Sequence, residues 1–132
     1  TKDRCKNNVI ATSNLMSDLG FILNFEKSVF IPTQAIVHLG NVIDSVKTIV
    51  YLPTEKKEKI RVSCQNLLKS TVITIRELSQ NIGLLVSSFS AVEFGKLHYR
   101  NLEIGKTQAL NENKGNFEAK VKLSLEMKIE LQ

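Results

Sequence analysis

Apolar residues recur at intervals of three and four along most of this chain, which is the spacing of a helix that buries one face. The first stripe consists of Cys5, Val9, Thr12, Met16 and Leu19. The same spacing predicts helices over residues 3–19, 93–110 and 117–131. Two more helices are expected between them, one that follows Thr54 and ends before Ser70, and one that follows Thr74 and ends before Ser87. Polar, glycine-containing residues 111–116 are expected to form a turn between the two C-terminal helices.

Between the first two predicted helices the pattern changes to short runs rich in β-branched residues. Residues 29–31 are expected to form a short strand that ends at Pro32. Residues 35–43 and 48–52 are expected to pair as a β-hairpin, connected by residues 44–47. The order of helix, hairpin and further helices predicts an α+β fold. The first helix and the hairpin resemble the edge of a larger sheet whose other strands are absent.

Two helix starts carry a local signal. Thr54 follows Pro53 and is expected to cap the second helix. The sequence Thr74-Ile75-Arg76-Glu77 fits a capping box, in which a hydroxyl and a carboxylate each accept from a free backbone amide. Gly83 lies inside the helix behind this box, where it costs about 1 kcal/mol relative to alanine. A glycine there indicates close approach of another helix or of a ligand backbone.

Composition adds a preference for an anionic partner. The 132 residues are 42% hydrophobic and 23% charged, and the formal net charge is +5. This composition is that of a globular protein, and the positive charge favours an anionic partner, of which nucleic acid is one kind. The two cysteines, Cys5 and Cys64, and the two histidines, His38 and His98, lack metal-ligand spacing, so no metal site is expected.

The chain has no apolar run of the length of a membrane span and begins with polar residues, so we expect no membrane association. The unpaired cysteines are expected to be reduced thiols of an intracellular protein, cytoplasmic or nuclear. Because the first residue is Thr1 rather than methionine, the chain is expected to be a fragment.

Several strings occur in an informative order. They are LGFILNFEKSVFIPTQAIVHLGNVID (residues 19–44), LPTEKKEKI (52–60), TIRELSQNIGLLVSSFSAV (74–92) and FGKLHYRNLE (94–103). Together they resemble the C-terminal palm, thumb and connection of retrotransposon reverse transcriptases, which are RNA-directed DNA polymerases. The resemblance is greatest to DIRS-like and gypsy-type elements and extends from about residue 5 to residue 125.

This resemblance implies three regions. Residues 1–53 would be the end of the palm with a primer-grip-like hairpin, residues 54–92 a helical thumb, and residues 93–132 connection helices that lead toward an absent ribonuclease H-like region. The expected partners are an RNA–DNA or DNA primer–template duplex and the remainder of the polymerase polypeptide.

In this family the catalytic Tyr-x-Asp-Asp turn lies just before the helix that opens this chain. Here the aspartates are Asp3, Asp18 and Asp44, and no two are adjacent. Because two-metal phosphoryl transfer needs carboxylates that hold both ions, the fragment alone is expected to be inactive. Mg²⁺ is expected as the cofactor of the intact parent, and no cofactor is expected for the fragment.

The resemblance carries over three sites. Lys27 matches a lysine thought to protonate the leaving pyrophosphate, although it also fits a solvated surface lysine. His38-Leu39-Gly40 matches the primer grip, with histidine where the family usually has phenylalanine or tyrosine. Residues matching the helix that tracks the minor groove are Arg76, Gln80, Asn81 and Gly83.

A basic cluster before the capping box could add phosphate contacts or simply form a solvated helix face. It consists of Lys56, Lys57, Lys59 and Arg61. Two other interpretations of the whole chain remain open at this point: a stand-alone small basic helical module that binds nucleic acid or a protein, and a truncated genomic relic without function.

Overall fold

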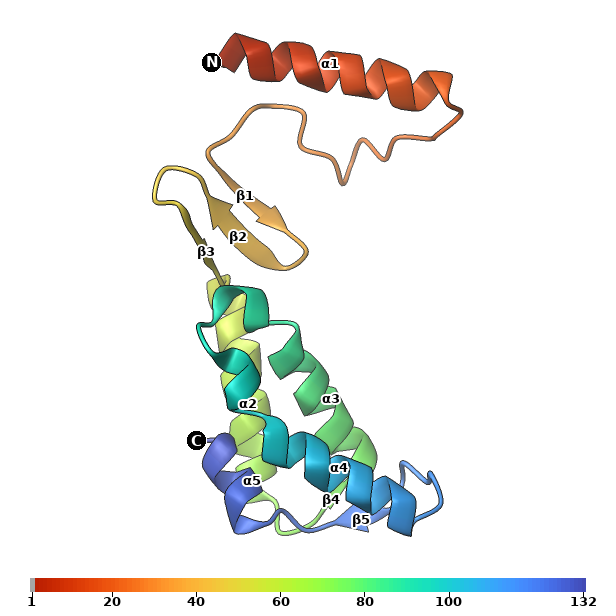
Figure 1. The fold of residues 1–132 in the computed structure, drawn as a ribbon, viewed down its shortest axis with the longest axis vertical. Coiled ribbons are helices and arrows are strands. Elements are labelled where there is room, and N and C mark those ends of the chain that lie inside the picture. The colour runs from red at the N-terminus through yellow and green to blue at the C-terminus, as the bar shows by residue number, and fades with distance from the viewer. Residues whose placement is uncertain (1) are drawn as a thin grey trace.

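The computed structural model describes residues 2–132 as an elongated α+β molecule, with helix α1 at one end, a small sheet in the middle and the other helices at the far end (Figure 1). The helices are α1 (Lys2–Asp18), α2 (Thr54–Lys69), α3 (Ile75–Val86), α4 (Arg100–Glu112) and α5 (Leu125–Glu130), and single 3-10 turns lie at η1 (Phe89–Ala91) and η2 (Gly95–Leu97). The strands are β1 (Ala35–His38), β2 (Asn41–Asp44), β3 (Ile49–Tyr51), β4 (Ile73–Thr74) and β5 (Lys120–Val121).

The sheet in the middle is a three-stranded antiparallel meander in the order β1-β2-β3, rather than the expected two-stranded hairpin. The expected strand over residues 35–43 is interrupted because Leu39 and Gly40 both have positive φ, 48° and 76°. Positive φ at both central residues is the geometry of a tight hairpin turn whose twist suits the flanking strands. Residue 38 therefore pairs with residue 41.

The expected strand over residues 29–31 is not formed, since this segment has no strand beside it among residues 2–132. Phe30 instead stacks on Phe25, with ring centroids 5.3 Å apart. The segment runs beside α1, and the two enclose an apolar groove of about 450 Å³. Helix α1 forms as predicted but buries no side chain, and of the predicted apolar stripe only Val9, which lines this groove, is half-buried.

The hydrophobic core lies in the helical end of the molecule, between α2, α3, α4 and α5. Leu78 and Leu102 are completely buried at its centre, and Leu67, Ile82 and Met127 surround them. Gly105 of α4 allows this packing, because a Cβ atom there would lie only 2.7 Å from the sulfur of Met127. The helical end thus has a core of its own.

The predicted helix over residues 117–131 is wrong for its first half, which forms a turn and strand β5, and only its last part forms α5. Strand β5 pairs with β4, which places Val121 opposite Ile73. The amides of Ile75 and Arg76 also donate to the carbonyls of Ala119 and Phe117. These bonds to a segment more than forty residues earlier in the chain outweigh the local helical pattern.

The predicted capping box is confirmed at the start of α3. The Glu77 amide donates to Thr74 Oγ1 over 3.2 Å, and Glu77 Oε2 accepts from the Thr74 amide over 2.7 Å. The cap expected at Thr54 is wrong, because Pro53 occupies the cap position and no side chain caps α2. The helix expected from residue 93 begins only at residue 100, since Phe94 has a positive φ of 55°.

Candidate nucleic-acid interface

The turn of the sheet, the start of α2 and the end of α3 meet at Lys56. Its Nζ donates to the carbonyl oxygen of Ser87 over 2.8 Å. The same ammonium lies against Gly40, where an added Cβ atom would be 3.3 Å from Nζ. Lys56 therefore joins the turn at Gly40 to Ser87, the residue that follows α3.

A second contact fixes the turn on the helical end. The Asn41 side-chain amide, which is buried, donates to Ser90 Oγ over 2.8 Å. His38 and Leu39 remain exposed beside it, at the edge of a small depression of about 220 Å³. The roles of Asn41 and Ser90 were missed from sequence, because only the folded chain brings residues 49 positions apart together.

The outer face of α3 carries three of the four predicted groove-tracking residues. Arg76, Gln80 and Gly83 are exposed, and their spacing of four and three residues places them on one face of the helix. Ser87 continues the same line to Lys56. These residues and their neighbours are here called the α3 strip, defined as Arg76, Gln80, Gly83, Ser87, Lys56 and the turn at Leu39-Gly40.

Asn81 does not belong to the α3 strip, which corrects the prediction. Its side chain is 1% exposed and points toward α2. Its amide nitrogen donates to Ser63 Oγ over 2.9 Å and makes a longer contact of 3.5 Å with Cys64 Sγ. Its Oδ1 atom has no hydrogen-bond partner in the described chain. Asn81 therefore joins α3 to α2 and is inaccessible to a duplex.

The residues of the predicted basic cluster point to different sides of α2. Successive residues of a helix are rotated by about 100°, so Lys56 faces the α3 strip while Lys57 and Arg61 line a separate groove of about 660 Å³. Arg61 Nη2 contacts Glu58 Oε1 over 2.7 Å. The hydrogen bonds that Arg61 donates to Glu58 lower the pKa of the Glu58 carboxyl and raise the pKa of Arg61.

Lys59 lies three residues after Lys56, which is about 60° short of a full helical turn. It therefore lies on the side of Lys56 away from that groove. It is exposed. Of the four predicted basic residues, Lys56 is the one that belongs to the α3 strip, through its contact with Ser87.

Lys27 lies apart from these residues, on the segment between α1 and β1 (Figure 1). Its side chain is exposed, and its backbone amide donates to Asn24 Oδ1 over 3.0 Å. The structure therefore does not bring Lys27 together with the α3 strip.

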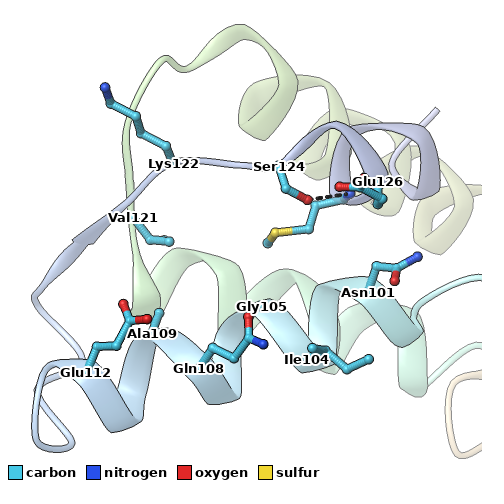
Figure 2. A pocket seen from close by; sticks show the side chains of 11 residues that line it. Asn101, Ile104, Gly105, Gln108, Ala109, Glu112, Val121, Lys122, Ser124 and Glu126 are labelled. Atoms are coloured by element: carbon cyan, nitrogen blue, oxygen red, sulfur yellow. Dashed lines mark hydrogen bonds between the residues drawn. The ribbon is translucent and has the colours of Figure 1, made fainter.

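Another groove, of about 370 Å³, lies between α4 and the segment from β5 to α5. Figure 2 shows Glu112 at one end and Glu126 at the other, with Gly105 between them. The two carboxylates do not converge, so the groove offers no acid–base pair. Ser124 Oγ accepts from the Met127 amide and thereby caps α5.

The described part of the chain has neither a cluster of metal ligands nor a helix that could span a membrane. Within residues 2–132, no group of three potential histidine, cysteine or carboxylate ligands is close enough to hold an ion. No helix among these residues combines the length and the apolar character needed to cross a bilayer.

Comparison with known proteins found no matching family model, no matching curated protein and no matching solved structure.

Proposed function

We propose that this chain is the palm–thumb portion of a retroelement reverse transcriptase and that its α3 strip holds the backbone of a primer–template duplex. The order of motifs from residue 19 to residue 103 supports the family. The net charge of +5 supports an anionic ligand. Contacts of this kind, to sugars and phosphates, do not depend on base sequence, as copying of any template requires.

Gly83 is the observation that carries the proposal. It stands in the middle of α3, where glycine lowers helix stability by about 1 kcal/mol relative to alanine. A Cβ atom added there would meet nothing within 4 Å, so packing inside the chain does not require glycine. Close approach of an external backbone explains why a residue without a side chain stands at this exposed point of the α3 strip.

The dimensions of the α3 strip suit a duplex backbone. From Arg76 to Ser87 the helix advances about 16 Å, and Lys56 and Gly40 extend the surface beyond its end. Lys56 is held by a carbonyl oxygen rather than by a carboxylate. Its positive charge is therefore not neutralised by that contact and remains available to a phosphate.

The proposed role is binding rather than catalysis by this chain alone. Asp44 is buried, and its Oδ1 accepts from the amides of Val46 and Lys47, so it serves the β2–β3 turn. Asp3 and Asp18 lie near opposite ends of α1. Polymerisation, with Mg²⁺ and with Lys27 as proton donor, belongs to the intact parent.

The substitution Gly83→Ala tests the proposal. We expect it to raise the free energy of unfolding by up to about 1 kcal/mol. We also expect it to weaken binding of a labelled RNA–DNA hybrid, measured by fluorescence anisotropy at about 50 mM salt. Gly83→Leu should weaken binding further. A matched control is Gln65→Ala, at an exposed site of α2 outside the α3 strip. Unchanged binding by both Gly83 variants would refute the proposed contact.

A stand-alone binding module is the second candidate. The observation that favours it is the separate core of the helical end, whose buried members all lie within residues 64–131. A module that binds another protein should bind an RNA–DNA hybrid no more tightly than it binds a neutral polymer at the same mass concentration. Binding of the full chain to the hybrid should instead fall steeply between about 50 and 200 mM salt if phosphates are the ligand.

A further inference from the structure

We infer that Phe117 and Glu118 are positioning residues that hold Arg76 so that the outer edge of its guanidinium meets a backbone phosphate. The inference rests on the proposed function and adds two residues to it. Neither belongs to the motifs that suggested the family, and both lie about forty residues after Arg76 in the chain.

The guanidinium of Arg76 is held on one edge and on one face. Its Nε donates to Glu118 Oε1 over 2.5 Å. Its central carbon lies 5.9 Å from the centroid of the Phe117 ring, a distance at which a cation is attracted to an aromatic face. Within residues 2–132 the two terminal nitrogens donate to no acceptor, and 57% of the side chain is exposed.

This arrangement leaves the fork of terminal nitrogens for an external ligand. A guanidinium can bind two oxygens of a phosphate at once through parallel N–H groups. Because an exposed arginine otherwise loses side-chain entropy when it binds, an arginine already held in position loses less. Glu118 and Phe117 thus reduce the cost of forming the contact.

The two positioning residues are themselves fixed to the start of α3. The Arg76 amide donates to the Phe117 carbonyl over 2.9 Å, and the Ile75 amide donates to the Ala119 carbonyl over 3.0 Å. Strands β4 and β5 pair directly beside these bonds. The segment that carries Phe117 and Glu118 is therefore part of the fold at this point.

The charged side chains near Arg76 indicate how it would contribute to phosphate binding. Glu77 follows it in the chain, but its carboxylate accepts from the Thr74 amide and hydroxyl and is engaged as the cap. Lys120 stands opposite Thr74 across the β4–β5 pair. The two acidic side chains, Glu77 and Glu118, and the two basic ones, Arg76 and Lys120, together carry no net charge. Arg76 therefore supplies a directed short-range contact, and Lys56 supplies attraction at the other end of the α3 strip.

The test compares Glu118→Ala, Glu118→Gln and Phe117→Leu in hybrid binding by the full chain. Glu118→Ala frees the guanidinium, and we expect affinity to fall about three- to tenfold. Glu118→Gln keeps an oxygen that can accept from Nε, so we expect affinity within about twofold of the unmodified chain. Phe117→Leu keeps apolar contact without the ring and should have a smaller effect than Glu118→Ala.

A matched control is Glu58→Ala, which releases Arg61 from a similar ion pair outside the α3 strip and should leave affinity unchanged. The Nε–H resonance of Arg76, followed by NMR, reports directly whether Glu118 holds the side chain in each variant. Thermal unfolding measured on the same samples separates loss of contact from loss of fold. If Glu118→Ala binds as tightly as the unmodified chain or more tightly, the inference is overturned. If the unmodified chain and the Glu58→Ala variant both fail to bind the hybrid, the proposed function fails as well.

Discussion

The carboxylate of Glu130, near the end of the chain, caps the first turn of α4 by accepting from the backbone amide of Leu102 over 2.9 Å. Its other oxygen accepts from the amide and the side chain of Asn101. The first amides of a helix have no partner within it. A residue of α5 thus satisfies the start of α4 and fastens the last helix to the core.

Replacing Glu130 with alanine should lower the free energy of unfolding by about 1–2 kcal/mol, since a cap and charge-assisted hydrogen bonds are lost together. Chemical denaturation followed by circular dichroism measures the change. Glu112→Ala, at the exposed far end of α4, is the control and should have little effect. Equal stability of the Glu130 variant and the unmodified chain would show that the cap contributes nothing.

Asn81 gives a prediction that separates a structural role from a binding role. Asn81→Leu removes a buried Oδ1 that has no partner in the described chain but also the hydrogen bond to Ser63, so these opposed effects should change the free energy of unfolding by less than about 1 kcal/mol. Asn81→Asp buries a charge without a counter-ion and should cost more than about 3 kcal/mol. Hybrid binding by the folded Asn81→Leu variant should equal that of the unmodified chain, and a clear loss would contradict the burial of this residue.

The capping box at α3 predicts a dependence of stability on pH. The Thr74 backbone amide, and then its hydroxyl, lower the pKa of Glu77 in the folded state. A lowered pKa contributes stability that is complete above the ordinary glutamate value of about 4.3 and is lost as the pH falls through the lower, folded-state pKa. Glu77→Gln should therefore flatten the fall in melting temperature in this acidic range. An unchanged slope would argue against the cap.

Local signals predicted those parts of the fold that depend on neighbours in sequence. The Thr74–Glu77 cap needs only residues three positions apart, so it could be predicted without the fold. Strand β5 and the turn before it could not, because they depend on pairing with β4, more than forty residues earlier. The turn at Leu39 was not predicted, because a leucine with positive φ is rare. The following Gly40 was the one residue of the pair that adopts positive φ readily.

The candidate site shows the same division. The spacing of Arg76, Gln80 and Gly83 predicts one helix face, and the structure exposes all three. The error at Asn81 was avoidable, since this residue lies three positions after Leu78 and therefore shares its buried stripe. The part played by Glu118 has no signal in sequence, because tertiary pairing alone brings it to Arg76.

Helix α1 has a thermodynamic consequence for the whole chain. Its 17 residues bury no side chain, and most of the stability of helices in proteins comes from tertiary packing, of which α1 has little. Its amides should therefore exchange with deuterium much faster than those of α3 and α4, whose opening requires disruption of the core. A partner that covers α1 would stabilise the helix and slow this exchange. The exchange rate of the α1 amides would therefore detect binding of such a partner.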